Sequence, residues 1–299
     1  MQWVRGRVRW MLLAGLLVLA TVVIFVEQSL HQSVSQTDYP VQRTVKYSFT
    51  VKNPNNRLVK KSEIWIYAPI KESAFQHVAS VDSTYPYKIS GDGNGNQRMT
   101  FMIENLPPFA TRTITVTARI NLSDRGNRID SLHNSNYLSD GKMLGLTNSA
   151  IQRVAQNLKK DEPRETANRI YQWITHNIKQ SGYLKNDRGA PDTLKRRSGD
   201  CTEFMYLFSA LARANGIPTR NMAGFVTREN RILKPVDYHN WNEAYIDGEW
   251  YLIDTDKQVF MEKSSEYIAM RSIQESTQAH SVDSQSFFAS TAEIHVSMN

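Results

Sequence analysis

Residues 199–218 read GDCTEFMYLFSALARANGIP and carry the strongest structural signal in the chain. Apolar side chains in the middle of this stretch recur at helical spacing, which predicts a helix with a buried face. Gly216 and Pro218 are expected to end that helix. Cys201, the only cysteine among 299 residues, therefore lies in the first turn of the predicted helix.

The position of Cys201 has a chemical meaning. The unpaired backbone N–H groups and the positive end of the helix dipole stabilise a thiolate at a helix N-terminus, and the thiolate is the nucleophilic form. The basic run at 195–197, KRR, adds positive potential at the same end. A lone cysteine is also a common small buried residue. On these residues alone, a nucleophile and a buried hydrophobic side chain both remain open.

A second segment supplies a partner for the thiol. Residues 238–256 read YHNWNEAYIDGEWYLIDTD, and the Asp-Gly pair at 247–248 is typical of a two-residue hairpin turn. In that register His239 lies directly opposite Asp256 and diagonally opposite Asp254, on one face of the hairpin. A carboxylate on one imidazole nitrogen leaves the other nitrogen to face a thiol. The hairpin pattern by itself does not show which of the two aspartates is the partner of His239.

These two segments resemble the core of the transglutaminase-like superfamily, most strongly over residues 165–256. Members of that family carry Cys, His and Asp in this chain order on a papain-like fold. The resemblance implies that Cys201 is the nucleophile, His239 the base and Asp254 the orienting carboxylate, which decides between the two aspartates. Two positions depart from the family pattern: Asn240 replaces a more usual small residue, and Asp256 replaces a small or hydroxyl residue.

The first residues predict a membrane anchor. An uncharged run of 17 residues, WMLLAGLLVLATVVIFV at 10–26, follows three arginines at positions 5, 7 and 9. This pattern favours an uncleaved signal anchor at 1–29 over a cleaved signal peptide. The arginines are expected to stay in the cytoplasm, which places the bulk of the chain on the periplasmic side of a bacterial inner membrane. The polar residues 30–40 are typical of a tether.

The spacing of apolar residues divides the remaining chain into a β-rich part and a part that begins with helices. Alternating apolar residues over 41–122, with a GDGNGN loop at 91–96, predict an all-β sandwich of immunoglobulin-like type. Residues 123–147 are interpreted as a connection. Apolar residues at helical spacing on either side of 159–163 predict two helices, with which a domain at 148–299 begins. The expected fold class is α+β, with a papain-like transglutaminase core preceded by the sandwich and one transmembrane helix.

Composition excludes several other functions. One cysteine rules out an internal disulfide and any zinc site with two thiolates. The 36 basic against 29 acidic residues are spread along the chain without a nucleic-acid-binding motif. The other histidines lack ligand spacing, so no metal and no cofactor are expected. The oligomeric state stays open.

The expected protein is a membrane-anchored periplasmic thiol enzyme. It would cleave or transfer amide bonds through a cysteine thioester, as a protease or amidase or as a transglutaminase-type acyltransferase. The expected partners are the inner membrane and a peptide or amino-acid-bearing envelope polymer. The alternative is a non-catalytic envelope binding or assembly module built on the same fold.

The topology can be tested with fusions after residue 299. Alkaline phosphatase, which is active only in the periplasm, should be active in the full-length fusion and inactive when residues 10–26 are deleted. A reporter that works only in the cytoplasm should stay silent in the full-length fusion. Activity of the cytoplasmic reporter would contradict the predicted orientation.

Overall fold

The computed structural model of the chain describes residues 38–92, 95–127, 137–273, 288–289 and 293–299. Residues Tyr39–Asn299 form one compact unit. The described residues contain no helix that combines the length and the apolar character needed to cross a membrane. Several predicted features lie outside the described residues, namely the anchor at 1–29, positions 30–37 of the tether, positions 93–94 of the hairpin loop and positions 128–136 of the connection.

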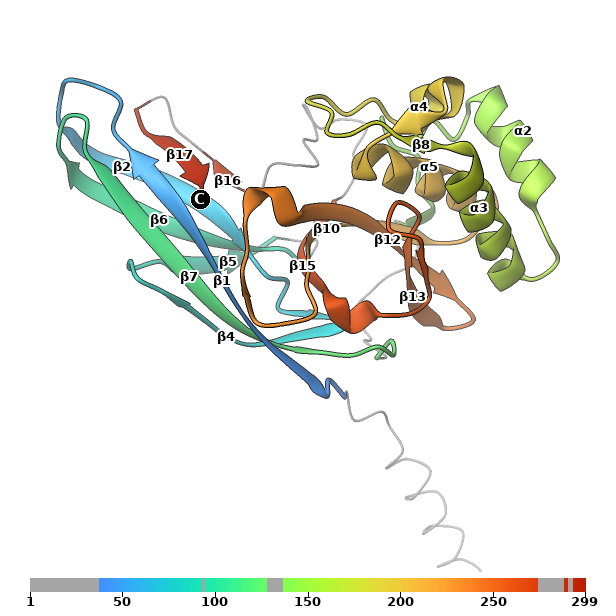
Figure 1. The fold of residues 1–299 in the computed structure, drawn as a ribbon, viewed down its shortest axis with the longest axis horizontal. Helices are drawn as coiled ribbons and strands as arrows, with labels where there is room; N and C mark the ends of the chain where they lie inside the picture. The colour runs from blue at the N-terminus through green and yellow to red at the C-terminus, as the bar shows by residue number, and fades with distance from the viewer. Residues whose placement is uncertain (1–37, 93–94, 128–136, 274–287, 290–292) are drawn as a thin grey trace, which may run out of the picture. The chain divides into compact units, whose positions relative to one another are not determined.

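Two β-sheets form the first part of the compact unit (Figure 1). The larger sheet has the order β11-β1-β7-β4-β3, and β17 also pairs with β1. The smaller sheet has the order β16-β2-β6-β5. The bounds in the larger sheet are β1 Val41–Lys52, β3 Glu72–Ser73, β4 Gln76–Ser83, β7 Thr111–Leu122, β11 Arg231–Ile232 and β17 His295–Met298. Those in the smaller sheet are β2 Val59–Ala68, β5 Lys88–Gly91, β6 Gln97–Leu106 and β16 Phe288–Ala289.

The two sheets share one apolar core. Inward residues such as Tyr47 and Phe49 of β1 and Phe101 of β6 are fully buried in it, and they alternate with more exposed neighbours as a half-buried strand requires. The alternation read from the sequence is therefore observed, and the immunoglobulin-like type stays a prediction. The sequence did not reveal that β11 and β17, which come from residues beyond 148, extend the larger sheet.

The second part combines a five-stranded sheet with four helices among the described residues. The sheet has the order β14-β13-β12-β10-β15, and Figure 1 shows the helices together beside it. The helices are α2 Ser149–Leu158, α3 Pro163–Asn177, α4 Ala190–Arg196 and α5 Cys201–Ala214. The strands are β10 Thr219–Val226, β12 Tyr238–Ile246, β13 Glu249–Asp254, β14 Val259–Phe260 and β15 Tyr267–Ile273. Short elements complete this part: β8 Lys179–Gln180, β9 Ser198–Gly199, η2 Pro235–Asp237 and η3 Ser264–Glu266.

Helix α5 lies at the centre of this second part. It packs against β10 and β12 on one side and against α2, α3 and α4 on the other. Consequently every residue from Thr202 to Arg213 is buried. The sequence predicted only one buried apolar face for this helix. The side toward the sheet has no such apolar signal, because Thr202 and Ser209 make side-chain hydrogen bonds there with residues of β10 and β12. The break between α2 and α3 covers residues 159–162, within the predicted 159–163.

Two side-chain amides join the sandwich to the edge strand β15. Asn96, in the loop after β5, donates from Nδ2 to the Ser272 carbonyl at 3.0 Å and accepts from the Ser272 N–H at 2.6 Å. Gln76 of β4 makes the same pair of hydrogen bonds with Ala269, at 3.0 and 2.9 Å. Each amide thus satisfies backbone groups of β15 that a neighbouring strand would otherwise bind. The Asp92 carboxylate orients Asn96 through bonds of 3.0 Å to its N–H and to Nδ2.

Replacing Asn96 by Ala should reduce the free energy of unfolding by about 1–3 kcal/mol, because it leaves the buried N–H and C=O of Ser272 unpaired. Urea denaturation of residues 38–299 measures the change. Asn121→Ala, on the half-buried side of β7, is the matched control and should stay within about 0.5 kcal/mol of the wild type. Equal effects of the two substitutions would show that the amide does not contribute to docking of the sandwich.

Candidate active site

The start of α5 is held by a capping box. Asp200 is the N-cap, and its Oδ1 accepts from the Thr202 N–H at 2.9 Å. Glu203 Oε2 accepts in return from the Asp200 N–H at 3.2 Å. This reciprocal pair begins the helix at Cys201, so the thiol occupies the first helical position as predicted, and it is half-buried.

The same two carboxylates hold the preceding loop. Asp200 Oδ2 accepts from the Leu184 N–H at 2.8 Å, and Glu203 Oε1 accepts from the Arg188 N–H at 2.9 Å. Burial raises the pKa of Glu203 to about 7; the Arg188 N–H opposes this rise, and the neighbouring Asp200 adds to it. The loop that precedes the thiol in the chain is therefore hydrogen-bonded directly to the start of the helix that carries the thiol.

The hairpin that carries the other candidate groups has the predicted register. Strands β12 and β13 pair from Ile246 with Glu249 to Asn242 with Ile253. The two turn residues at 247–248 have φ values of 52° and 88°, the positive values that a tight hairpin turn of this kind requires. The two-residue turn inferred from Asp-Gly is confirmed.

His239 and Asp254 meet at the far end of this hairpin. His239 Nε2 lies 2.6 Å from Asp254 Oδ2, and both side chains are buried. Asp254 also accepts from the Lys257 N–H at 2.9 Å and from the Tyr267 hydroxyl at 2.8 Å. With its oxygens bound in this way, the carboxylate is fixed in one orientation and directs Nδ1 of the imidazole away from itself.

Asp256 lies on the other side of the imidazole ring. Its Oδ2 is 4.0 Å from His239 Nδ1, and its Oδ1 accepts from Gln180 Nε2 at 2.7 Å. The hairpin pattern favoured neither aspartate, and the distances in the structure distinguish them. Asp254 binds Nε2, whereas Asp256 lies beyond hydrogen-bond distance of Nδ1. The assignment of Asp254 as orienting group stays a prediction about catalysis, and the geometry is consistent with it.

The charges in the site favour a protonated imidazole. Burial opposes this form, but the Asp254 charge and its hydrogen bond outweigh burial, Cys201 acts in the same direction, and the pKa of His239 is raised to about 10. Burial likewise opposes ionisation of Asp254, yet His239, the Lys257 N–H and the Tyr267 hydroxyl lower its pKa overall. Burial and the Asp254 charge raise the pKa of Tyr267, so its hydroxyl stays a donor. A cationic imidazole beside the thiol is the condition for a thiolate–imidazolium pair.

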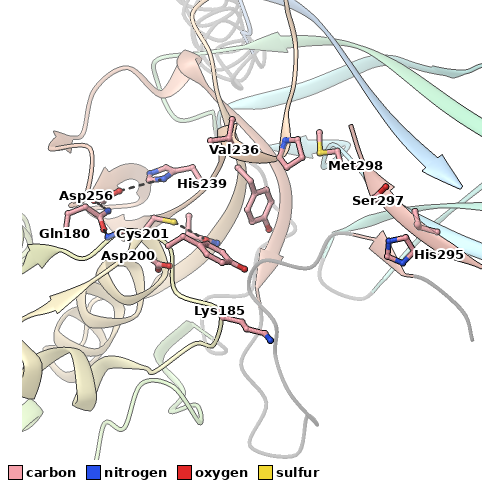
Figure 2. A pocket seen from close by; sticks show the side chains of 16 residues that line it. Gln180, Lys185, Asp200, Cys201, Val236, His239, Asp256, His295, Ser297 and Met298 are labelled. Atoms are coloured by element: carbon pink, nitrogen blue, oxygen red, sulfur yellow. Dashed lines mark hydrogen bonds and ion pairs between the residues drawn. The ribbon is translucent and has the colours of Figure 1, made fainter. Parts of the chain in front are cut away.

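An open cleft gives access to these groups (Figure 2). Cys201, His239 and Asp256 lie on one side, and residues of β17 lie across from them. Its lining includes Gln180, Gly182, Tyr183, Lys185, Asp200, Pro235, Val236, Tyr238, Asn240, His295, Val296, Ser297 and Met298. The cleft is thus bounded both by the helix-bearing part and by a strand of the larger sheet.

Several of these neighbours could not be assigned from the sequence. Gln180 belongs to the two-residue strand β8 and has no motif around it, although its parallel pairing with Gly199 places it beside the start of α5. Tyr267 begins β15 and reaches Asp254 only through the tertiary fold. In the described part of the chain no three metal-ligating side chains converge. The chemistry available at the site is that of a thiol, an imidazole and carboxylates.

Comparisons with known proteins place the segment that carries these groups in a known family. Residues 152–255 match the family model of the transglutaminase-like superfamily, so this part of the chain is a transglutaminase-like domain. A solved structure of a candidate cysteine protease from Cytophaga hutchinsonii covers 87% of this chain and 92% of its own, with 18% identity and a TM-score of 0.54. That similarity establishes a shared fold.

The periplasmic domain of TgpA from Pseudomonas aeruginosa, solved with ethylmercury, aligns over 74% of this chain and 92% of its own. Its identity is 17% and its TM-score is 0.37. No curated protein is significantly similar to the chain in sequence. The sequence-based resemblance to the transglutaminase-like superfamily is confirmed by the family model.

The two aspartates are expected to differ in their effect on turnover. Asp254→Asn keeps the shape but removes the charge that stabilises the imidazolium, so kcat should fall by about 10² to 10⁴. Asp256→Asn should reduce kcat far less, because Asp256 makes no hydrogen bond to the ring. Both are to be measured on the best substrate from a fluorogenic peptide amide library. A larger loss in Asp256→Asn would contradict the assignment of Asp254.

Proposed function

We propose that this protein is a thiol enzyme that cleaves or transfers amide bonds through a thioester on Cys201. The observation that carries the proposal is the buried His239–Asp254 pair, whose imidazole also interacts with the Cys201 thiol at the first position of a helix. A structural cysteine does not require a buried imidazole with a raised pKa beside it, nor an open cleft above it.

The reaction follows from the arrangement of these three groups. The Cys201 thiolate attacks the amide carbonyl carbon, and the carbon–nitrogen bond breaks as His239 gives its Nδ1 proton to the leaving amine. In the second step water or an amine attacks the thioester, His239 removes the proton of that nucleophile, and the carbon–sulfur bond breaks. Asp254 keeps its negative charge throughout and stabilises the imidazolium whenever it forms.

We place this activity at the periplasmic face of a bacterial inner membrane. The support is the uncharged run at 10–26 with arginines before it. An enzyme tethered there would meet peptides and amino-acid-bearing polymers of the envelope, which we propose as its substrates. The sandwich, proposed to be of immunoglobulin-like type, supplies β17 to the cleft and would contact an extended polymer bound there.

The proposal is tested by the reactivity of the thiol. A free thiol such as that of glutathione is only a few per cent ionised at pH 7. Because Cys201 acts as a thiolate in the proposed reaction, the wild-type protein should react with iodoacetamide at least about tenfold faster than glutathione does. His239→Ala should lose this advantage. Cys201→Ala should abolish amide turnover and thioester formation, detected by hydroxylamine trapping, while the melting temperature changes little.

A wild-type rate equal to that of glutathione would contradict the enzyme and favour the alternative, a non-catalytic envelope binding or assembly module. A large fall in melting temperature in Cys201→Ala would instead indicate that the residue acts mainly as a buried packing group. The two readouts therefore separate a nucleophile from a structural cysteine.

A further inference from the structure

The side chain of Asn240 contacts the thiol and has an unusual environment. Asn240 follows His239 in β12, is 1% exposed and lines the cleft. Its Oδ1 lies 3.6 Å from Cys201 Sγ and 3.3 Å from Thr202 Oγ1, and accepts from both. Its Nδ2 is buried and has no hydrogen-bond partner among the described residues. An amide with its oxygen doubly used and its nitrogen unused is an unfavourable arrangement in a protein interior.

The arrangement becomes favourable once the thiol ionises. A protonated thiol donates to Oδ1, whereas a thiolate has no proton to donate and is repelled by the amide oxygen. The two ends of an amide have nearly the same shape, so a half-turn about the Cβ–Cγ–amide axis exchanges them in the same space. Nδ2 would then donate to the sulfur, and the buried donor would gain a charged acceptor.

The surroundings are compatible with both orientations. The Thr202 hydroxyl can donate to Oδ1 or accept from Nδ2, so it remains a partner in either case. Ala223, which pairs with Asn240 across β10 and β12, is a small residue.

We propose that Asn240 stabilises the Cys201 thiolate by turning its amide so that Nδ2 donates a hydrogen bond to the sulfur. This inference rests on the proposed function, because only a nucleophilic thiolate gives the donor its role. The amide and the imidazolium then bind the sulfur from two residues that are adjacent in β12. The thiolate is held at the start of α5 and does not depend on His239 alone for compensation of its charge.

The test is the pH dependence of Cys201 alkylation by iodoacetamide between pH 5 and 9.5, which needs no amide substrate. Asn240→Ala should move the rise of the alkylation rate to higher pH and reduce the rate at pH 6 by about tenfold, the effect of one hydrogen bond to a charged group. At pH 9.5 the rates of the variant and the wild type should converge, because the thiol is then ionised in both. Thiolate absorbance near 240 nm should show the same shift.

A near-isosteric variant keeps the test independent of folding. Asn240→Asp retains the shape but has no donor when ionised and adds a negative charge beside the sulfur, so its shift should exceed that of Asn240→Ala. Asn121→Ala, remote from the cleft, is the control and should keep the wild-type profile. A structural role for Asn240 would lower alkylation equally at all pH values, and would lower the melting temperature, without moving the profile.

The outcomes separate this inference from the proposed function. A wild-type profile in Asn240→Ala and Asn240→Asp would overturn the role of Asn240 and leave the thiol enzyme intact. A wild-type thiol that ionises like that of glutathione would overturn both, since no thiolate would exist near neutral pH for the amide to bind. A shifted profile with convergence at high pH supports the inference.

Discussion

The buried ion pair between His239 and Asp254 is the constraint on which the rest of this site depends. Charges removed from water need partners on every side, and here they are supplied by separate parts of the chain. The hairpin turn sets the register, Lys257 contributes a backbone N–H, and Tyr267 contributes a hydroxyl from another strand. Together these contacts fix the carboxylate that binds Nε2 of the imidazole, which leaves Nδ1 on the side away from Asp254.

The thiol is positioned by a different kind of interaction. The Asp200 and Glu203 carboxylates cap the start of their own helix and also accept from N–H groups of the loop before it. The same two side chains therefore determine where the helix begins and where the cleft wall lies. The nucleophile and the base thus come from two rigid elements, a helix terminus and a strand, that pack directly on each other. Neither group depends on a long loop for its position.

The sequence predicted the parts of this site that depend on local order. Asp-Gly at 247–248 forces a two-residue turn, and the turn alone puts His239 near both Asp254 and Asp256; the helix period likewise places Cys201 at a helix start. The choice between the two aspartates came from the family resemblance. Strand alternation shows which residues share a face of the hairpin, but it does not show which nitrogen of the imidazole a carboxylate contacts. Contacts between distant segments, such as Gln180 with Asp256, had no local pattern to report them.

The pairing of β17 with β1 has a consequence for the order of assembly. β1 leaves the ribosome before its partner on this edge, the segment His295–Met298, which is synthesised about 240 residues later. Because those residues line the cleft opposite Cys201, helix α5 and the His239 hairpin can be complete while one wall of the cleft is still missing. One wall of the cleft is therefore completed only after residues 295–298 have been synthesised, later than the segments that carry Cys201 and His239.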